Sequence, residues 1–109
     1  MEILLVLTTL PDAASAQSLA EQLVERRLAA CVSILAPCRS VYRWQRKLES
    51  AEETPVLIKT TADRYPALEA MIRQAHPYEL PEIVAVPIDR GLPAYLTWVA
   101  AETQPDPTS

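Results

Sequence analysis

The chain has 109 residues, of which half are apolar and 22% are charged, and its formal net charge is −4. A chain of this length and composition predicts one soluble domain built from two packed layers of secondary structure. The negative charge argues against a nucleic-acid binder held by phosphate contacts, and no apolar run is long enough to span a membrane.

A strand and an amphipathic helix open the chain. Residues 3–9 form a continuous apolar run ending in two threonines, which predicts a central strand covered on both faces. Asp12 follows Pro11 and predicts the N-cap of a helix. Apolar residues then recur at three- and four-residue steps and predict the buried stripe of that helix: Ala16, Leu19, Ala20, Leu23, Val24 and Leu28.

The next two strands predict a long hairpin. Residues 28–35 and 40–44 form one strand with a bulge or kink near Pro37, because proline cannot donate a backbone hydrogen bond. We expect the turn within residues 45–49, before a strand that ends at residues 56–61. The hairpin would project beyond a compact body, and its unpaired edges would need another chain to cover them.

A second helix follows, capped by Asp63 and ended by Pro77 near His76. Its predicted buried stripe comprises Tyr65, Leu68, Ile72 and Ala75. Residues 83–88 predict the fourth strand, and a last helix follows Gly91.

The order of the elements defines the predicted fold. A β-α-β-β-α-β order with an extra C-terminal helix indicates an α+β, ferredoxin-like domain, in which the helices cover one face of an antiparallel sheet. We predict a single domain over residues 1–103 and a disordered polar tail over residues 104–109.

The two cysteines bear on the cellular compartment. In an extended segment Cys31 and Cys38 would lie roughly 20 Å apart, too far for a disulfide. Together with the lack of a clear secretory signal, two isolated thiols predict a cytoplasmic protein.

The stretch from residue 76 to 83 holds the only histidine, and it has two interpretations. His76 beside Tyr78, Glu79 and Glu82 is consistent with a general base, a proton switch or a metal ligand. Alternatively, His76 and Tyr78 simply fix a proline-stiffened connection between helix and strand. We prefer the second interpretation, because no HxH, HExxH or CxxC spacing brings three metal ligands together.

The hairpin carries aromatic residues whose role is also open. Tyr42 and Trp44 stand two residues apart and therefore share one face of their strand. Exposed aromatic residues on a projecting hairpin favour a subunit interface over a ligand shelf.

Charged residues near the hairpin give a further set of alternatives. Glu49, Glu52 and Glu53 are typical of a solvated turn, but they can also bind a hard cation or pair with nearby Arg43, Arg46 or Lys47. Lys59 ends a buried strand and must bring its ammonium group to water or to a carboxylate such as Glu79 or Glu82.

The sequence lacks the motifs of nucleophilic catalysis and of phosphate binding. It has no GxSxG motif, neither cysteine has a histidine nearby in the sequence, and a single glycine excludes a glycine-rich phosphate loop. We therefore predict that the protein is not an enzyme. A hydrolase on the same fold ranks last, since the chain contains no asparagine to act with an arginine.

Several motifs in register resemble the CutA family, the divalent-cation tolerance proteins. The resemblance rests on Leu28-Ala29-Ala30-Cys31-Val32, Ser40-Val41-Tyr42-Arg43-Trp44, Lys47-Leu48-Glu49, Ile58-Lys59-Thr60-Thr61, the 76–83 stretch and Tyr95-Leu96-Thr97-Trp98. It implies a cytoplasmic ferredoxin-like protomer in a tight homotrimer, whose hairpin strands pair across subunits as Tyr42 and Trp44 enter the interface.

The resemblance also implies a ligand cleft between subunits. Its expected residues are His76, Tyr78, Glu79, Glu82 and Lys59, and its expected metal ligands, for a divalent cation such as copper or zinc, are His76 and Glu53. The trimer would resemble that of the PII signalling proteins. This leaves as the alternative a regulatory trimer that binds a small anionic metabolite and acts through an unidentified partner.

Two departures from the family pattern carry physical consequences. Arg46 replaces a glycine that the family often has in the hairpin turn, so a positive φ there would add strain of about 1 kcal/mol. Thr8 stands where some members have a cysteine, which removes the most natural ligand for a soft metal ion such as copper.

Overall fold

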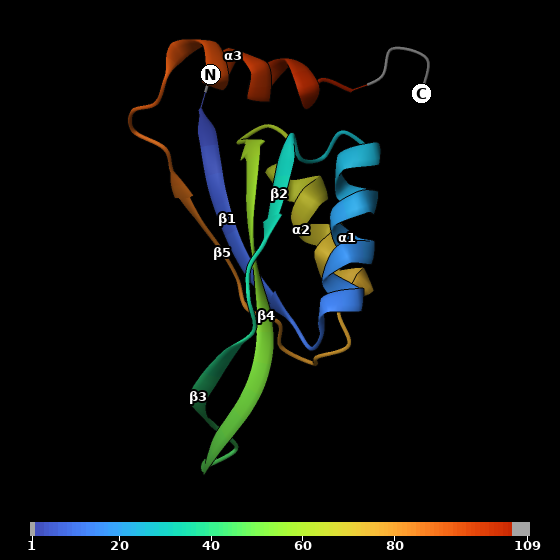
Figure 1. Cartoon of the computed structure of the whole chain (residues 1–109), viewed down its shortest axis with the longest axis vertical. Coiled ribbons are helices and arrows are strands. Elements are labelled where there is room, and N and C mark those ends of the chain that lie inside the picture. Colours follow the sequence, from blue (N-terminus) through green and yellow to red (C-terminus); the bar gives the residue numbers. More distant parts are fainter. Residues whose placement is uncertain (1, 106–109) are drawn as a thin grey trace.

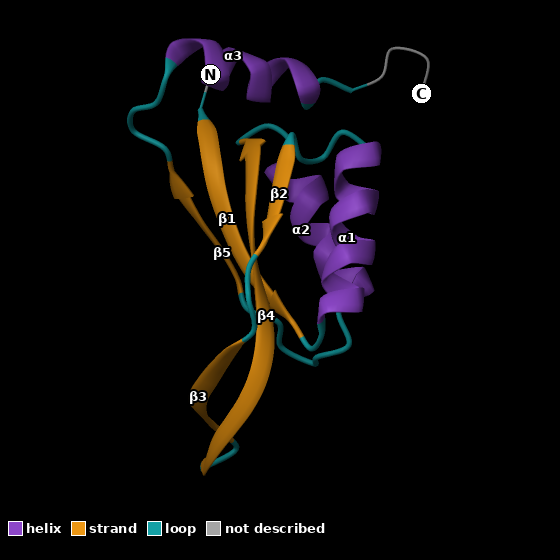
Figure 2. Cartoon of the chain, viewed as in Figure 1, coloured by secondary structure: helices purple, strands orange, loops and turns teal. Residues whose placement is uncertain are grey.

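A computed structural model describes residues 2–105 and confirms the ferredoxin-like fold. Five strands form an antiparallel sheet, with two helices on one face and a third helix across one end (Figures 1 and 2). The elements are β1 (Ile3–Leu10), α1 (Ala13–Glu25), β2 (Cys31–Ile34), β3 (Cys38–Trp44), β4 (Lys47–Thr61), α2 (Tyr65–Ala75), β5 (Ile83–Pro87) and α3 (Pro93–Glu102).

The strands of the body follow the order β2-β4-β1-β5, and every pairing is antiparallel. β3 stands outside this order and pairs with the far half of β4. The chain passes from β2 to β3 through residues 35–37, where the predicted break at Pro37 is confirmed.

The core lies between the sheet and the first two helices. Alternate residues of β1, namely Leu4, Val6 and Leu10, point into it and meet Leu23 of α1 and Ile72 of α2. A smaller cluster forms where Val99 of α3 packs against Ile3 and Ala30.

Asp12 caps α1 as predicted, because its Oδ1 accepts a hydrogen bond from the Ser15 amide at 2.7 Å. The helix ends at Glu25, before Leu28, the last residue of the predicted buried stripe. Leu28 N donates to Leu23 O, and Arg27 N to Val24 O, which is the hydrogen-bond pattern of a Schellman motif. The residue in the left-handed conformation is Arg27, with φ 59°, rather than a glycine.

Three details of the helices differ from the sequence-based expectation. Val24 is 42% exposed and Ala75 is also exposed, so neither belongs to a buried stripe. Leu28 is buried but lies beyond the end of α1. Asp63 does not cap α2, since the N-cap is Arg64 and no side chain bonds to the first turn.

The hairpin projects from the body as predicted, and we call β3, the turn and residues 47–54 of β4 the arm (Figure 1). The longest extent of the protein is 46 Å and its radius of gyration is 14.6 Å. A compact domain of this length would have a radius of gyration of about 13 Å. The arm therefore accounts for the elongated shape.

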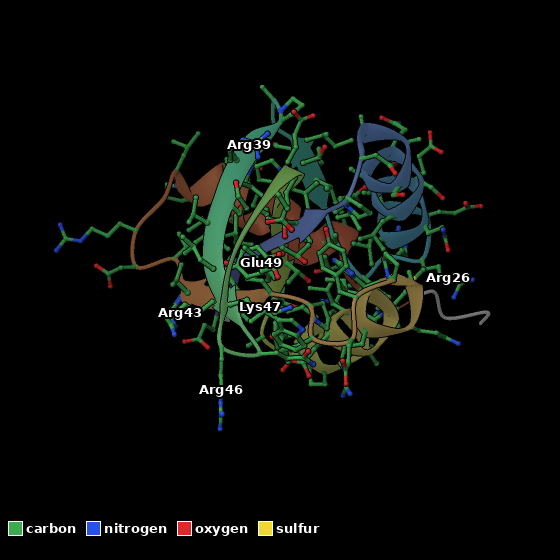
Figure 3. All side chains as sticks on the ribbon, turned by 90° about the horizontal axis from the view of Figure 1, so that it is seen from below. Arg26, Arg39, Arg43, Arg46, Lys47 and Glu49 are labelled. Carbon is green, nitrogen blue, oxygen red and sulfur yellow. The ribbon has the colours of Figure 1, made fainter. Side chains whose placement is uncertain are left out.

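The turn at the tip of the arm is tighter than predicted. It consists of Gln45 and Arg46 alone, while residues 47–49 already pair with β3. Both turn residues have positive φ, 50° and 68°, as a two-residue turn matching the strand twist requires. Figure 3 shows the Arg46 side chain pointing away from the body.

The predicted polar tail falls mainly on residues 106–109, which lie outside the described residues. Pro105 and Gln104 are exposed and follow the end of α3.

Replacing Arg46 with glycine should stabilise the protein. Glycine removes the strain of a side chain at φ 68°, although its greater freedom in the unfolded chain offsets part of the gain. We expect the free energy of unfolding to rise by about 0.5–1 kcal/mol in urea at fixed protein concentration. Lys47→Gly is the control, and it should lower that free energy by about 0.5–1 kcal/mol. An equal loss in both variants would show that the turn is not strained.

Candidate functional site

A cavity of about 690 Å³ lies where the arm leaves the body, and we call it the arm cavity. Four parts of the chain line it: the end of β1, β3, the middle of β4 and the loop before β5. The lining residues are Thr9, Ser40, Val41, Tyr42, Arg43, Trp44, Glu53, Tyr78, Glu79, Leu80 and Glu82. Most of the residues predicted from the sequence therefore meet in one place.

The register of the arm explains how Glu53 and the aromatic residues come to share the cavity. Cys38 pairs with Glu53 and Tyr42 pairs with Glu49, and residues directly opposite one another point to the same side. Side chains alternate along β3, so Tyr42 and Trp44 stand on the Glu53 side of the ribbon. Glu49, opposite Tyr42, is four residues from Glu53, roughly 13 Å along β4.

His76 lies beneath the arm cavity and does not line it. The ring is only 7% exposed, its Nε2 bonds to the backbone oxygen of Thr9, and its Nδ1 accepts from the Tyr78 amide at 3.2 Å. A carbonyl oxygen only accepts, so Nε2 carries the proton and the ring is the neutral tautomer. Both nitrogens are thus engaged in holding the loop to β1.

Tyr78 extends that connection into the arm cavity. Its ring centroid lies 4.6 Å from that of His76, which fixes the orientation of the phenol. Burial raises the pKa of Tyr78 first of all, and the nearby Glu53 carboxylate adds to the rise by charge and by hydrogen bonding, with a smaller effect of Tyr42. The two tyrosines and Glu53 therefore form one electrostatically linked group.

Glu53 is the least exposed charged residue of the arm cavity, at 7%. Its Oε2 accepts a hydrogen bond from the Thr9 hydroxyl at 3.1 Å. Within residues 2–105 the only ion pair joins Arg90 to Asp89, so no cationic side chain neutralises Glu53. A buried carboxylate whose partners are neutral hydroxyl groups is costly unless a cation joins it.

Lys59 is not part of this group. It pairs with Leu5 and Cys31 at the far end of the sheet, six residues along β4 from Glu53, or roughly 20 Å. Within residues 2–105 of one chain, neither Glu79 nor Glu82 lies within ion-pair distance of Lys59, so the chain does not form this suggested contact by itself.

The position of Thr8 also separates it from the arm cavity. Thr8 is fully buried and, unlike Thr9, does not line the arm cavity, since successive residues of a strand face opposite sides. Its hydroxyl has no hydrogen-bond partner. A cysteine in place of Thr8 would point into the core side of the sheet.

The sequence missed Thr9, the hydrogen-bond partner of both His76 and Glu53. Its two contacts come from parts of the chain 44 and 67 residues away, so no local sequence pattern predicts them. It also considered Arg43 only as a pairing partner for Glu49, Glu52 or Glu53, whereas the structure places it in the wall of the arm cavity.

The donor atoms of the arm cavity indicate which metal ions it can hold. Carboxylate and phenol oxygens come from Glu53, Glu79, Glu82 and the tyrosines, with no thiol or free imidazole nitrogen. Among the described residues, no three His, Cys, Asp or Glu side chains converge as a ready metal site. This donor set lacks the soft ligands that Cu(I) prefers, whereas it suits ions that accept oxygen ligands.

Fold and cavity together define a class: a ferredoxin-like domain with a projecting hairpin and a carboxylate-bearing cavity at its base. The family model described as "CutA1 divalent ion tolerance protein" matches residues 4–102. The chain belongs to this CutA family of divalent-cation tolerance proteins.

Individual relatives agree over nearly the whole chain. The divalent-cation tolerance protein CutA of Pectobacterium atrosepticum is 44% identical over 92% of this chain and 91% of its own length. The crystal structure of CutA from Xylella fastidiosa superposes with a TM-score of 0.92 at 43% identity, covering 95% of this chain and 100% of that one. A CutA from Archaeoglobus fulgidus, described as periplasmic, gives a TM-score of 0.90 at 32% identity, over 94% and 99% of the two chains.

Replacing His76 should test its structural role. His76→Ala leaves the Thr9 carbonyl and the Tyr78 amide without a partner, so we expect the free energy of unfolding to fall by about 2 kcal/mol. His76→Gln should lose less, because its amide nitrogen can still donate to Thr9. Gln74→Ala, at an exposed position of α2, is the control and should stay within about 0.5 kcal/mol of wild type in urea unfolding. A loss in His76→Ala no larger than in this control would contradict the assignment.

Proposed function

We propose that this chain acts in the response to divalent metal ions as a homotrimer whose arm cavities bind a divalent cation at the subunit boundaries. The observation that carries the proposal is the buried Glu53 carboxylate, which faces the arm cavity without a cationic partner in the described part of the chain. Glu79 and Glu82 line the same cavity and can supply further oxygen ligands.

The two predicted metal ligands, Glu53 and His76, have different roles in this proposal. Glu53 keeps its predicted role. His76 serves as a positioning residue, since both of its nitrogens are engaged. Zinc accepts carboxylate oxygens and is a candidate ion, whereas Cu(I) would need softer ligands than the arm cavity offers. A second subunit would complete the coordination.

Assembly is supported by apolar surface that a single chain leaves uncovered. The sheet face opposite α1 and α2, which we call the helix-free face, carries Leu5, Leu7, Leu57, Val84 and Val86 in adjacent rows. On the arm, Leu48 is 75% exposed, and Val41, Tyr42 and Trp44 are exposed beside it. Apolar patches of this extent mark interfaces between proteins.

α3 adds to the same argument. Apolar residues occupy all sides of this helix, yet only Val99 is buried. Leu92, Tyr95 and Trp98 are exposed, and the Tyr95 and Trp98 rings lie 5.6 Å apart. A helix that is apolar all round is normally covered on all sides, so a neighbouring subunit is expected to cover this one.

In this proposal the chain is a non-enzymatic binding protein that acts in the cytoplasm. No nucleophile meets a free histidine nitrogen in the arm cavity. Cys31 and Cys38 are both free thiols, which fits a reducing compartment. None of the helices among residues 2–105 is both long and apolar enough to cross a membrane. A regulatory trimer for an anionic metabolite is less well supported, since three carboxylates and one guanidinium line the arm cavity.

The oligomeric state tests the assembly. Light scattering should give the mass of three 12.1 kDa chains at micromolar concentration. Trp44→Ala should shift the assembly toward smaller species on dilution, because it removes a large apolar side chain from the arm. Arg73→Ala, on the exposed side of α2, should leave the mass unchanged. A stable monomer of the wild-type chain would overturn the trimer.

Metal binding is tested by calorimetric titration of the wild-type protein with Zn²⁺, Mg²⁺ and Cu²⁺. We expect stoichiometric binding of Zn²⁺ or Mg²⁺, weakened by at least about tenfold in Glu53→Gln. The neighbouring Glu52→Gln is the matched control, because Glu52 is exposed and lies outside the arm cavity. An absence of binding in the wild type, or equal losses in the two variants, would remove the metal from the proposal.

A further inference from the structure

We propose that the arm cavity binds an organic cation, namely an ammonium group carried on an apolar body the size of a small metabolite. The ammonium group would lie against Glu53 and Tyr78, and the apolar body would extend along Tyr42 in the direction of Trp44. This inference goes beyond the binding of a metal ion and does not depend on one, but it rests on the proposed trimer, whose neighbouring subunits must leave the rings of Tyr42 and Trp44 accessible from the arm cavity.

The size of the arm cavity is the first argument. Its volume of about 690 Å³ falls within the range of roughly 300–1,000 Å³ found for small-molecule sites. A metal ion bonded to oxygen at about 2.0–2.6 Å would fill only one corner of it. The remaining volume fits an organic ligand.

The position of the charge is the second argument. Glu53 is buried at the inner end of the arm cavity, with Thr9 as its hydrogen-bond donor. Glu79 and Glu82 are exposed residues of the loop, where water screens their charge. A cation that enters the arm cavity therefore meets its strongest unscreened partner at the inner end. Arg43, the one cationic side chain in the wall, forms no ion pair among the described residues.

The aromatic lining is the third argument, and it separates an organic cation from a bare metal ion. Tyr42, Trp44 and Tyr78 present rings to the cavity that holds the carboxylate. The face of an aromatic ring attracts ammonium groups, and the combination of rings with a carboxylate is typical of sites for organic amines. The contact with His76 holds the Tyr78 ring in place. The aliphatic side chains of Val41 and Leu80 add apolar surface for the ligand body.

Three matched compounds test the proposal on the full-length, assembled protein freed of metal by a chelator. Phenethylammonium carries the positive charge, phenethyl alcohol is its neutral counterpart, and phenylacetate its anionic one. Calorimetric titration at neutral pH should show that the ammonium compound binds at least tenfold more tightly than the alcohol, and that phenylacetate does not bind. Equal affinity for the ammonium compound and the alcohol, or no binding of the ammonium compound, would overturn the proposal.

Two pairs of variants locate the site. Glu53→Gln should weaken phenethylammonium binding at least tenfold, whereas Glu52→Gln should leave it unchanged. Tyr42→Leu should also weaken binding, whereas Tyr42→Phe, which keeps the ring, should not. Circular dichroism confirms that each variant is folded. Equal effects within either pair would contradict the assignment.

The two tryptophans supply a readout in the wild-type protein that requires no change in the arm cavity. Trp44 lines the cavity, whereas Trp98 lies on α3 at the other end of the molecule. Titration with phenethylammonium should shift the indole N–H resonance of Trp44 and leave that of Trp98 in place, with Trp98→Phe assigning the two signals. A shift confined to Trp98, or no shift in either resonance, would overturn the proposal.

The outcome is distinguishable from that of the metal titration. If Zn²⁺ and Mg²⁺ bind while phenethylammonium does not, the organic-cation proposal fails and the metal proposal stands. If phenethylammonium binds in the absence of any metal binding, the reverse holds. If both bind, a saturating concentration of metal should weaken the binding of phenethylammonium, because both cations bind to Glu53.

Discussion

The length of β4 is the constraint on which the rest of the structure depends. The body of the sheet uses only its second half, where β4 lies between β1 and β2. Its first half continues beyond the end of β1 at Leu10 and finds a partner only in β3. One uninterrupted strand therefore serves both the core and the arm (Figure 2). Its register with β3 places Glu53 at their junction.

The junction is built around Thr9, although that residue has no reactive chemistry of its own. Its carbonyl holds His76 and its hydroxyl holds Glu53, so one residue of β1 aligns the loop and the arm on either side of it. The Tyr78 ring packs against the His76 ring, and the nearby Glu53 carboxylate contributes to the raised pKa of the Tyr78 phenol. The arm cavity is thus organised by neutral hydrogen bonds that leave its one buried carboxylate available.

Much of the fold could be predicted from the sequence, because strand and helix periodicity act over short distances. The order of elements, the Asp12 cap, the break at Pro37 and the projecting hairpin all depend on neighbouring residues. Two of the errors arose where a residue adopts a conformation unusual for its type. Arg27 ends α1 and Arg46 lies in the hairpin turn, both at positive φ. A positive φ is normally predicted from a glycine, which is absent at both positions.

The candidate site could be predicted only in part. The sequence indicated that four residues of one loop lie near one another, because they are close in the chain: His76, Tyr78, Glu79 and Glu82. The meeting of Glu53 with Thr9 depends on strand register over 44 residues, and the distance of Lys59 from the loop depends on which end of β4 it occupies. For His76 the sequence favoured a structural role over a metal-binding or catalytic one, but it could not identify the partners that occupy both ring nitrogens.

The alternation of side chains along β3 limits how the arm can change in evolution. Cys38 is paired with Glu53, and Tyr42 stands an even number of residues further along. Inserting or deleting a single residue between them would turn Tyr42 and Trp44 to the opposite side of the ribbon, unless a bulge absorbed the change. We therefore expect hairpins of this kind to lengthen or shorten by one pair of residues per strand, so that the aromatic wall keeps facing the carboxylate.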